Sequence, residues 1–180
     1  QVNAGPLRVC SCCFPKVAAD AQGKLYAAFR GEADDVREIA LFVTADQGKS
    51  WRGGTVSSDQ WRMNGCPMAG PALAVSPDGK SIALAWRTKE RLRGAISRDG
   101  GKRFGPFDLA QGVGMQDYPF AALGADGSGV LLWTAGGRWQ GVRVGTKADA
   151  RKPLEPGVAN AEASVLRGKD GQLLLLVAER

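Results

Sequence analysis

Sulfur-bearing side chains are the most distinctive reactive groups of this sequence, because all of them fall in three short segments. The segments cover residues 9–15, 61–68 and 112–119 and hold four cysteines and three methionines: Cys10, Cys12, Cys13, Cys66, Met63, Met68 and Met115. One hypothesis is a disulfide between Cys66 and one cysteine of the N-terminal triplet, because the adjacent Cys12 and Cys13 cannot easily bridge each other. The other is a soft-metal site, since thiolates and thioethers together select Cu(I). Free buried cysteines and a redox thiol are further alternatives.

Three arginines form a second candidate set. Arg30 and Arg87 each close an apolar run that we expect to be a strand, and Arg138 comes just after a third such run. Planar guanidinium groups bind carboxylates in a bidentate manner, so three of them on one face would suit an anionic ligand. The alternative is that these arginines are simply solvated at the strand ends.

Internal repeats indicate the elements that position these residues. Four segments share one plan, in which small apolar residues, a Gly-containing turn and an apolar run follow one another; the turn glycines are Gly23, Gly79, Gly127 and Gly171. Asp-Gly or Gln-Gly between apolar runs is a strong hairpin signal. The glycines are 56, 48 and 44 residues apart, and periods of this length are typical of four-stranded propeller blades.

A second motif recurs between the hairpins. Thr44-Ala-Asp46-Gln-Gly48-Lys-Ser-Trp51 and Ser97-Arg-Asp99-Gly-Gly101-Lys-Arg-Phe104 both read Ser/Thr-x-Asp-x-Gly-x-x-aromatic. The hydroxyl and the carboxylate are expected to bond backbone amides of a turn, while glycine supplies the left-handed residue. This motif resembles the Asp box, or bacterial neuraminidase repeat, of the sialidase-like β-propellers. The corresponding turn at 145–153 lacks it.

The resemblance implies an all-β fold of four-stranded antiparallel blades, in which the Asp box joins the third and fourth strands. It places blades at about 14–60, 68–113 and 118–157, with a partial blade at 161–180 and the outer strand of a preceding blade at 1–9. This amounts to three full blades with partial blades at both ends. We therefore expect part of a six-bladed ring, completed by a missing segment or a second chain; the alternative is a domain that is stable alone.

The same resemblance places the loops between blades and the loops between second and third strands on one face, opposite the Asp boxes. Sialidases bind the sugar carboxylate with three arginines and use a Tyr–Glu nucleophile pair and an Asp general acid. Here Tyr118, Asp117 and Glu32 are the catalytic candidates. The family's Phe-Arg-Ile-Pro type motif is missing, since Phe29-Arg30 is followed by Gly31. Tyr118 also precedes Pro119, and packing is the alternative role for its ring.

Tryptophans divide between the two expected environments. Three of them fall in strands and are expected in the blade core: Trp51, Trp86 and Trp133. Trp61 and Trp139 are expected in loops of the binding face, where they would stack on a sugar ring or shield a metal.

Composition narrows the class of protein. Hydrophobic residues make up 44% of the 180 and charged residues 23%, as in a globular domain, and no apolar run reaches the roughly 18 residues of a membrane span. The net charge of +6 permits anionic partners. The lysines and arginines are spread along the chain, so nucleic-acid binding is not expected. Because histidine is absent, the usual ligands of a hydrolytic zinc centre are missing.

The hypothesis that combines these observations is a periplasmic or secreted sialidase-like propeller that binds a glycan or another anionic small molecule. It requires no cofactor, and it leaves sialidase activity open. The sequence begins at Gln1, so we expect either a removed signal peptide or a piece of a longer protein. The alternatives are a periplasmic copper-binding protein that uses the cysteines and methionines, and a structural interaction module with disulfide-stapled loops.

Overall fold

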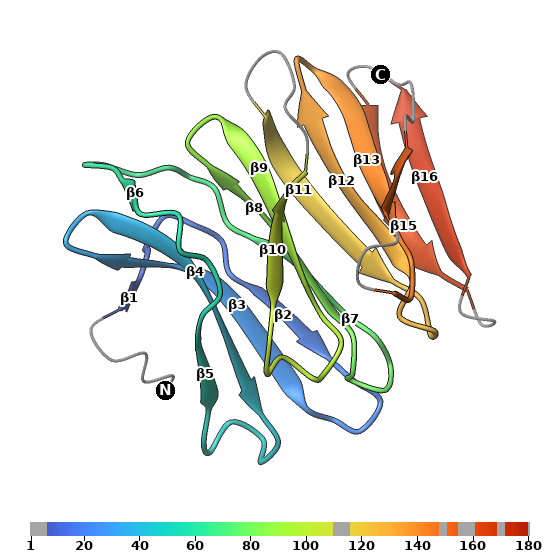
Figure 1. The fold of residues 1–180 in the computed structure, drawn as a ribbon, viewed down its shortest axis with the longest axis horizontal. Coiled ribbons are helices and arrows are strands. Elements are labelled where there is room, and N and C mark those ends of the chain that lie inside the picture. The colour runs from blue at the N-terminus through green and yellow to red at the C-terminus, as the bar shows by residue number, and fades with distance from the viewer. Residues whose placement is uncertain (1–6, 110–115, 148–150, 155–160, 169–171, 180) are drawn as a thin grey trace.

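The computed structural model describes residues 7–109, 116–147, 151–154, 161–168 and 172–179, and all regular structure in them is β-strand. Four antiparallel sheets follow one another along the chain (Figure 1). The predicted all-β fold of propeller blades is confirmed. Among the described residues, no helix has the length and apolar character needed to cross a membrane.

Each of the first three sheets contains a four-stranded meander in sequential order. The first has β2 (Lys16–Ala19), β3 (Leu25–Ala33), β4 (Val36–Thr44) and β5 (Arg52–Thr55). The second has β7 (Ala72–Val75), β8 (Ile82–Thr88), β9 (Arg91–Ser97) and β10 (Gly105–Asp108). The third has β11 (Gln116–Leu123), β12 (Gly129–Ala135), β13 (Arg138–Val144) and β14 (Arg151–Leu154). The fourth sheet is the pair β15 (Ala161–Arg167) and β16 (Leu173–Glu179).

Two short strands extend the first sheet. The strand β6 (Trp61–Arg62) pairs with the start of β4, and β1 (Arg8–Val9) pairs with the end of β3. Residues 1–9 were predicted as the outer strand of a preceding blade, and for Arg8 and Val9 this is wrong. The chain turns at residues 10–15 and continues into β2, so β1 and β2 lie along the same neighbour, β3. Residues 1–6 lie outside the described part.

Side-chain alternation along the strands builds the core between the blades. In β8, Ile82, Leu84 and Trp86 pack toward the first blade, whereas Ala83 and Ala85 pack toward the third. Tyr26 and Leu41 belong to the first of these cores, and Leu131 and Trp133 belong to the second. The predicted core positions of Trp86 and Trp133 are thus confirmed, while Trp51 is half-buried against a smaller cluster.

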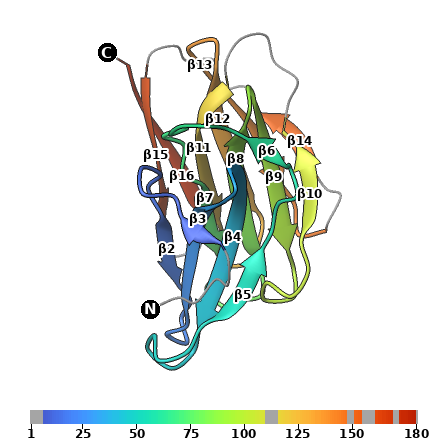
Figure 2. The ribbon, with the colours of Figure 1, turned by 90° about the vertical axis from the view of Figure 1, so that its left-hand side faces the viewer.

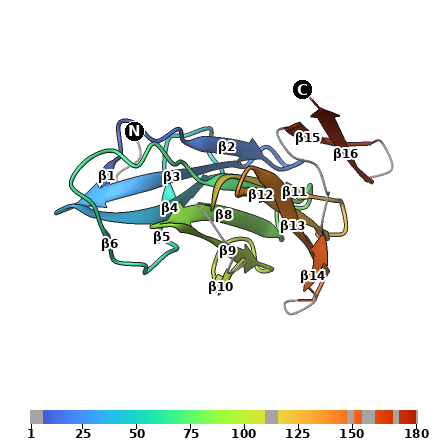
Figure 3. The same cartoon turned by 90° about the horizontal axis from the view of Figure 1, so that it is seen from above.

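The arrangement of the sheets is an arc of blades. Figure 2, with the first sheet toward the viewer, shows the second and third sheets behind it. Seen from above, the described sheets follow one another around the arc, and the outer strands β5, β10 and β14 lie on one side of it (Figure 3).

The Asp boxes form matching turns between the third and fourth strands of the first two blades. In one, the Thr44 hydroxyl accepts a hydrogen bond from the Gly48 amide (2.9 Å), and Asp46 accepts one from the Ser50 amide (2.8 Å). In the other, Ser97 and Asp99 accept the equivalent bonds at 2.9 Å and 3.0 Å. Gly48 and Gly101 have φ of 86° and 88°, which favours glycine. Both turns lie at the ends of the strands away from the β3–β4 and β8–β9 hairpins (Figure 1).

Candidate functional site

The two cysteine-containing loops meet between the first and second blades. The loop at 10–15 precedes β2 and the loop at 63–71 precedes β7. They approach so closely that a Cβ on Gly70 would clash with the Phe14 carbonyl oxygen. A hydrogen bond from the Cys10 amide to the Arg30 carbonyl (2.9 Å) fixes the start of the first loop on β3.

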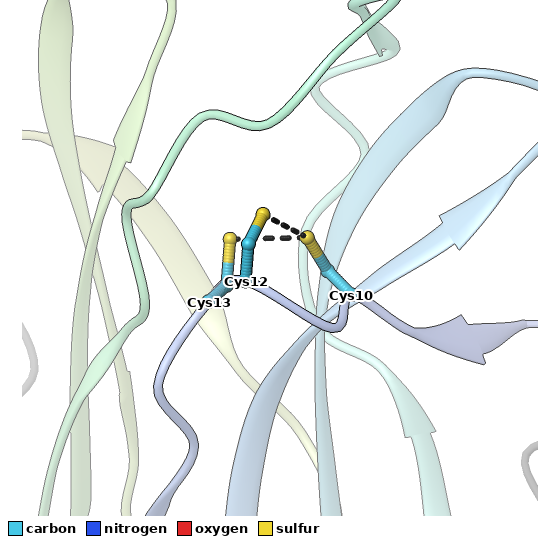
Figure 4. A group of neighbouring side chains, drawn as sticks. All are labelled: Cys10, Cys12 and Cys13. Carbon is cyan, nitrogen blue, oxygen red and sulfur yellow. Dashed lines mark hydrogen bonds between the residues drawn. The ribbon is translucent and has the colours of Figure 1, made fainter.

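A disulfide joins Cys12 to Cys66, as the sequence predicted for one member of the triplet. Cys10 and Cys13 are free thiols, and each residue is only 3% exposed. The Cys10 Sγ lies 3.1 Å from the Cys13 Sγ and 3.5 Å from the Cys12 Sγ (Figure 4). All four sulfurs therefore gather at one point, which we call the sulfur cluster (Cys10, Cys12, Cys13 and Cys66).

The surroundings of Cys13 favour its neutral thiol form. Burial, followed by the hydrogen bond with Cys10, raises the pKa of Cys13 to about 11. The guanidinium of Arg30 opposes this shift, because it attracts the thiolate form of Cys13. The two free thiols, Cys10 and Cys13, consequently have low solvent access and lie beside one positive charge.

Arg30 is buried at the centre of the site, so it is not part of a solvent-facing rim. It is 1% exposed, and burial lowers its pKa. Its Nε donates to the Ala69 carbonyl (2.7 Å) and its Nη2 donates to the Arg87 carbonyl (2.5 Å). The guanidinium carbon also lies 4.9 Å from the centre of the Trp61 ring, within range of a cation–π contact.

Arg87 connects this buried centre to the third blade. Its Nη1 forms an ion pair with Asp117 (2.9 Å), its Nη2 donates to the Pro67 carbonyl (2.6 Å), and its guanidinium lies 5.9 Å from the Trp61 ring centre. Trp61 itself is 8% exposed, because β6 pairs with β4 and holds it under these arginines. The structure thus brings together four of the predicted residues, in the order Arg30, Trp61, Arg87 and Asp117.

Tyr118 lies next to this group and faces solvent. Its side chain is 71% exposed, and its φ of 52° is in the left-handed region that a bulky residue rarely adopts. The register of β11 shifts between Asp117 and Phe120, and the Tyr118 amide donates to the Asp117 carboxylate (2.8 Å). A bulge of this kind re-aims a side chain at the end of a strand.

The other predicted residues have different surroundings. Glu32 forms an ion pair with Arg37 (2.9 Å) in the first blade. Arg138 and Trp139 were expected in or beside a loop, but they begin strand β13, where Arg138 is exposed and Trp139 is half-buried. The Met63 carbonyl accepts a hydrogen bond from Arg37 (3.1 Å), the Met68 side chain is 74% exposed, and Met115 lies outside the described residues.

Sequence reasoning missed two buried carboxylates beside the site. Asp59, whose side chain is 5% exposed, accepts a hydrogen bond from the Trp86 indole (2.6 Å) and pairs with Arg93. Glu38 accepts from the Ser57 hydroxyl and the Gln60 amide. Nothing in the local sequence marks either residue. By contrast, the C-x-x-C spacing of Cys10 and Cys13 was available as a signal for their proximity.

Comparisons with known proteins agree with this geometry at the level of the fold. No protein-family model matches the chain, and no curated protein matches it at a significant level. Among solved structures, Hadza microbial sialidase Hz136 superposes with a TM-score of 0.63 and 16% identity, over 98% of this chain and 43% of that one. Trypanosoma rangeli sialidase in complex with the inhibitor DANA superposes with a TM-score of 0.59 and 14% identity, over 97% of this chain and 34% of that one. The intramolecular trans-sialidase of Ruminococcus gnavus superposes with a TM-score of 0.50 and 17% identity, over 89% of this chain and 38% of that one.

The chain has the fold of the sialidase β-propellers and spans less than half the length of each of these structures. The sialidase-like resemblance noted in the Asp boxes is confirmed for the fold.

Proposed function

We propose that this chain supplies the carboxylate-binding part of a sialidase-like propeller whose inter-blade loop face binds an anionic glycan outside the cytoplasm. The observation that carries the proposal is the ion pair between Arg87 and Asp117 beside the exposed Tyr118. It lies on the face opposite the Asp boxes, where loops of successive blades meet. The disulfide between Cys12 and Cys66 supports an oxidising compartment.

The electrostatics of the site suit a carboxylate ligand. Two guanidinium groups, from Arg30 and Arg87, lie against one indole ring, and Asp117 is the carboxylate that contacts Arg87. Arg30 is buried and already occupied with backbone carbonyls, so it supports the site from beneath. Arg87 is the better candidate for direct contact, and a bound carboxylate would share it with Asp117.

Glycoside hydrolysis is the finer part of the proposal. By resemblance, Tyr118 would act as the nucleophile and Asp117 as the general acid. A tyrosine nucleophile needs an activating base within hydrogen-bond reach. Glu32, the candidate for this base, forms an ion pair with Arg37 in this structure. We therefore propose ligand binding as the main function and hydrolysis as the secondary one.

The test measures binding of a sialoside to the full-length protein by isothermal titration. We expect Arg87→Ala to weaken the affinity by about 10- to 100-fold, the range of a charge-assisted bond pair. The control is Arg52→Ala, which removes the same charge from an exposed position in β5. Equal affinity in Arg87→Ala and wild type would contradict the proposal. Turnover of a fluorogenic sialoside, compared between wild type and Tyr118→Phe, tests hydrolysis separately.

Completion of the propeller ring belongs to the same proposal. The chain spans less than half of each sialidase structure described above. We propose that a further segment or a second chain supplies the remaining blades, and the molar mass of the full-length protein by light scattering distinguishes these two sources.

A further inference from the structure

The sulfur cluster contains two pairs of cysteines that differ in solvent access. The outer pair, Cys12 and Cys66, is bonded; Cys12 is half-buried and Cys66 is exposed. The inner pair, Cys10 and Cys13, is reduced and buried. Cys10 lies between the pairs, with its sulfur 3.5 Å from Cys12 and 3.1 Å from Cys13.

These separations are short for a metal site. Four thiolates arranged tetrahedrally at about 2.3 Å from a metal ion lie about 3.8 Å apart, and two thiolates on opposite sides of an ion lie farther apart still. The Cys10 and Cys13 sulfurs are closer than that, and Cys12, which together with them forms a group that could hold a metal ion, is already bonded to Cys66. The geometry therefore favours disulfide chemistry over the soft-metal hypothesis.

We propose that the sulfur cluster is a thiol–disulfide exchange site, in which the disulfide moves from the exposed Cys12–Cys66 pair to the buried Cys10–Cys13 pair. This activity is separate from glycan binding and does not depend on it. Its substrate class is an external disulfide: the Cys12 and Cys66 thiols would form their own disulfide again as the external disulfide becomes two thiols, and the two electrons come in net from Cys10 and Cys13, which stay bonded to each other.

The exchange has two steps that balance internally. In the first, the Cys10 thiolate attacks the Cys12 sulfur; the Cys10–Cys12 bond forms, the Cys12–Cys66 bond breaks, and Cys66 leaves as a thiolate. In the second, the Cys13 thiolate attacks the Cys10 sulfur and Cys12 leaves. The two protons lost by Cys10 and Cys13 are taken up by Cys66 and Cys12. One disulfide and two thiols are present before and after, so no oxidant is needed.

Arg30 supplies a positive charge beside the thiols that react in this exchange. It is buried, and its positive charge attracts the Cys13 thiolate, although burial and the hydrogen bond with Cys10 still raise the pKa of that thiol. The Cys10 amide donates to the Arg30 carbonyl, so the residue that carries the attacking sulfur is held against the strand that carries this cation. Arg30 is a positioning residue here, because it does not touch the sulfur that is attacked in any described contact.

The experiment uses iodoacetamide, in the absence of oxygen, reductant and metal, on the native full-length protein. A Cys66 thiol released at the surface is alkylated and trapped, so we expect carboxamidomethyl-Cys66 to accumulate while a disulfide to Cys10 appears in the peptide map. The Cys10→Ser variant lacks the attacking sulfur, and labelling of Cys66 should be lost. The Cys13→Ser variant allows only the first step, so its map should show Cys10 bonded to Cys12.

Three results would overturn the proposal. They are the absence of Cys66 labelling in the wild type, labelling that is equal in Cys10→Ser, and a native mass that shows a metal ion held by all four cysteines. If Cys10→Ser does not fold, as judged by near-ultraviolet circular dichroism, the wild-type map and Cys13→Ser decide the question. Sialoside affinity is not part of this readout, so failure here and failure of the proposed function are distinguishable.

Discussion

Arg30 donates a hydrogen bond to the backbone carbonyl of Arg87, and this contact joins the second strands of two successive blades. The side chain of the first arginine thereby fixes the backbone that carries the second. Arg87 in turn reaches the third blade through Asp117. Three blades are thus connected at one end of their strands by polar contacts, whereas apolar cores connect them along their length.

Removal of the Arg30 side chain should destabilise the fold substantially. In Arg30→Ala, a buried and a partly buried carbonyl group lose their donor, and a cavity remains under Trp61. We expect the free energy of unfolding to fall by about 3 kcal/mol, which urea denaturation would measure. The exposed Arg143 provides the control, because Arg143→Ala removes the same charge from the surface of β13. A loss no larger than that of the control would contradict the structural role of Arg30.

The two carboxylates that contact Arg93 should differ in their effect on stability. Asp59 is buried and also accepts the Trp86 indole hydrogen, whereas the Asp108 side chain is 46% exposed. Asp59→Ala leaves a buried donor without its acceptor, and we expect a loss of about 3 kcal/mol in the free energy of unfolding. Asp108→Ala should cost less than about 1 kcal/mol, as for an exposed pair. Thermal unfolding of the two variants side by side tests this order.

The Asp box of the first blade should make stability depend on acid. Hydrogen bonds from the Ser50 side chain and amide, with one from Thr44, lower the pKa of Asp46 from 3.8 to about 2. A depressed folded-state pKa contributes stability above the unfolded value and loses it as the pH falls through the folded one. The free energy of unfolding should therefore decline between about pH 4 and pH 2, and Asp46→Asn should lack this part of the decline. Asp35→Asn, at an exposed turn position, is the matched control.

Reactivity of Cys13 should increase steeply in alkaline solution. Its pKa is raised to about 11 by burial and by the Cys10 hydrogen bond, against the attraction of Arg30 and a hydrogen bond from the Ala69 backbone. Few Cys13 thiolates exist at neutral pH, so native alkylation at this residue should be slow and should accelerate until the pH passes about 11. Mass spectrometry of quenched samples from pH 7 to 10 would follow it. A rate that is already constant above pH 8 would show that the thiol is not held neutral by its surroundings.

The blade architecture was predictable because its signals are local. Gly79 and Gly127 have φ of 69° and 78°, as the Asp-Gly hairpins required. The Asp boxes at Asp46 and Asp99 depend on contacts within four residues along the chain. Local patterns of this kind are visible in a single sequence.

The surroundings of the site residues were less predictable, because they depend on contacts between distant segments. Arg30 bonds to groups 39 and 57 residues away, and this places it inside the protein. Trp61 was expected to face a ligand, but its loop pairs with β4 and buries it. For the cysteines, their common location was predictable and their pairing was not, since three of them lie within four residues.

The Cys12–Cys66 bond closes a covalent loop of 54 residues that contains every strand of the first blade meander. If the chain is pulled from its two ends, force passes through the sulfur bridge and bypasses this blade. About 180 Å of chain is then shielded from extension, at roughly 3.4 Å per residue. With the disulfide on Cys10 and Cys13 instead, the same blade carries load and can be stretched. The position of one bond would thus decide whether the first blade behaves as a mechanically protected unit or as the part of the chain that yields under tension.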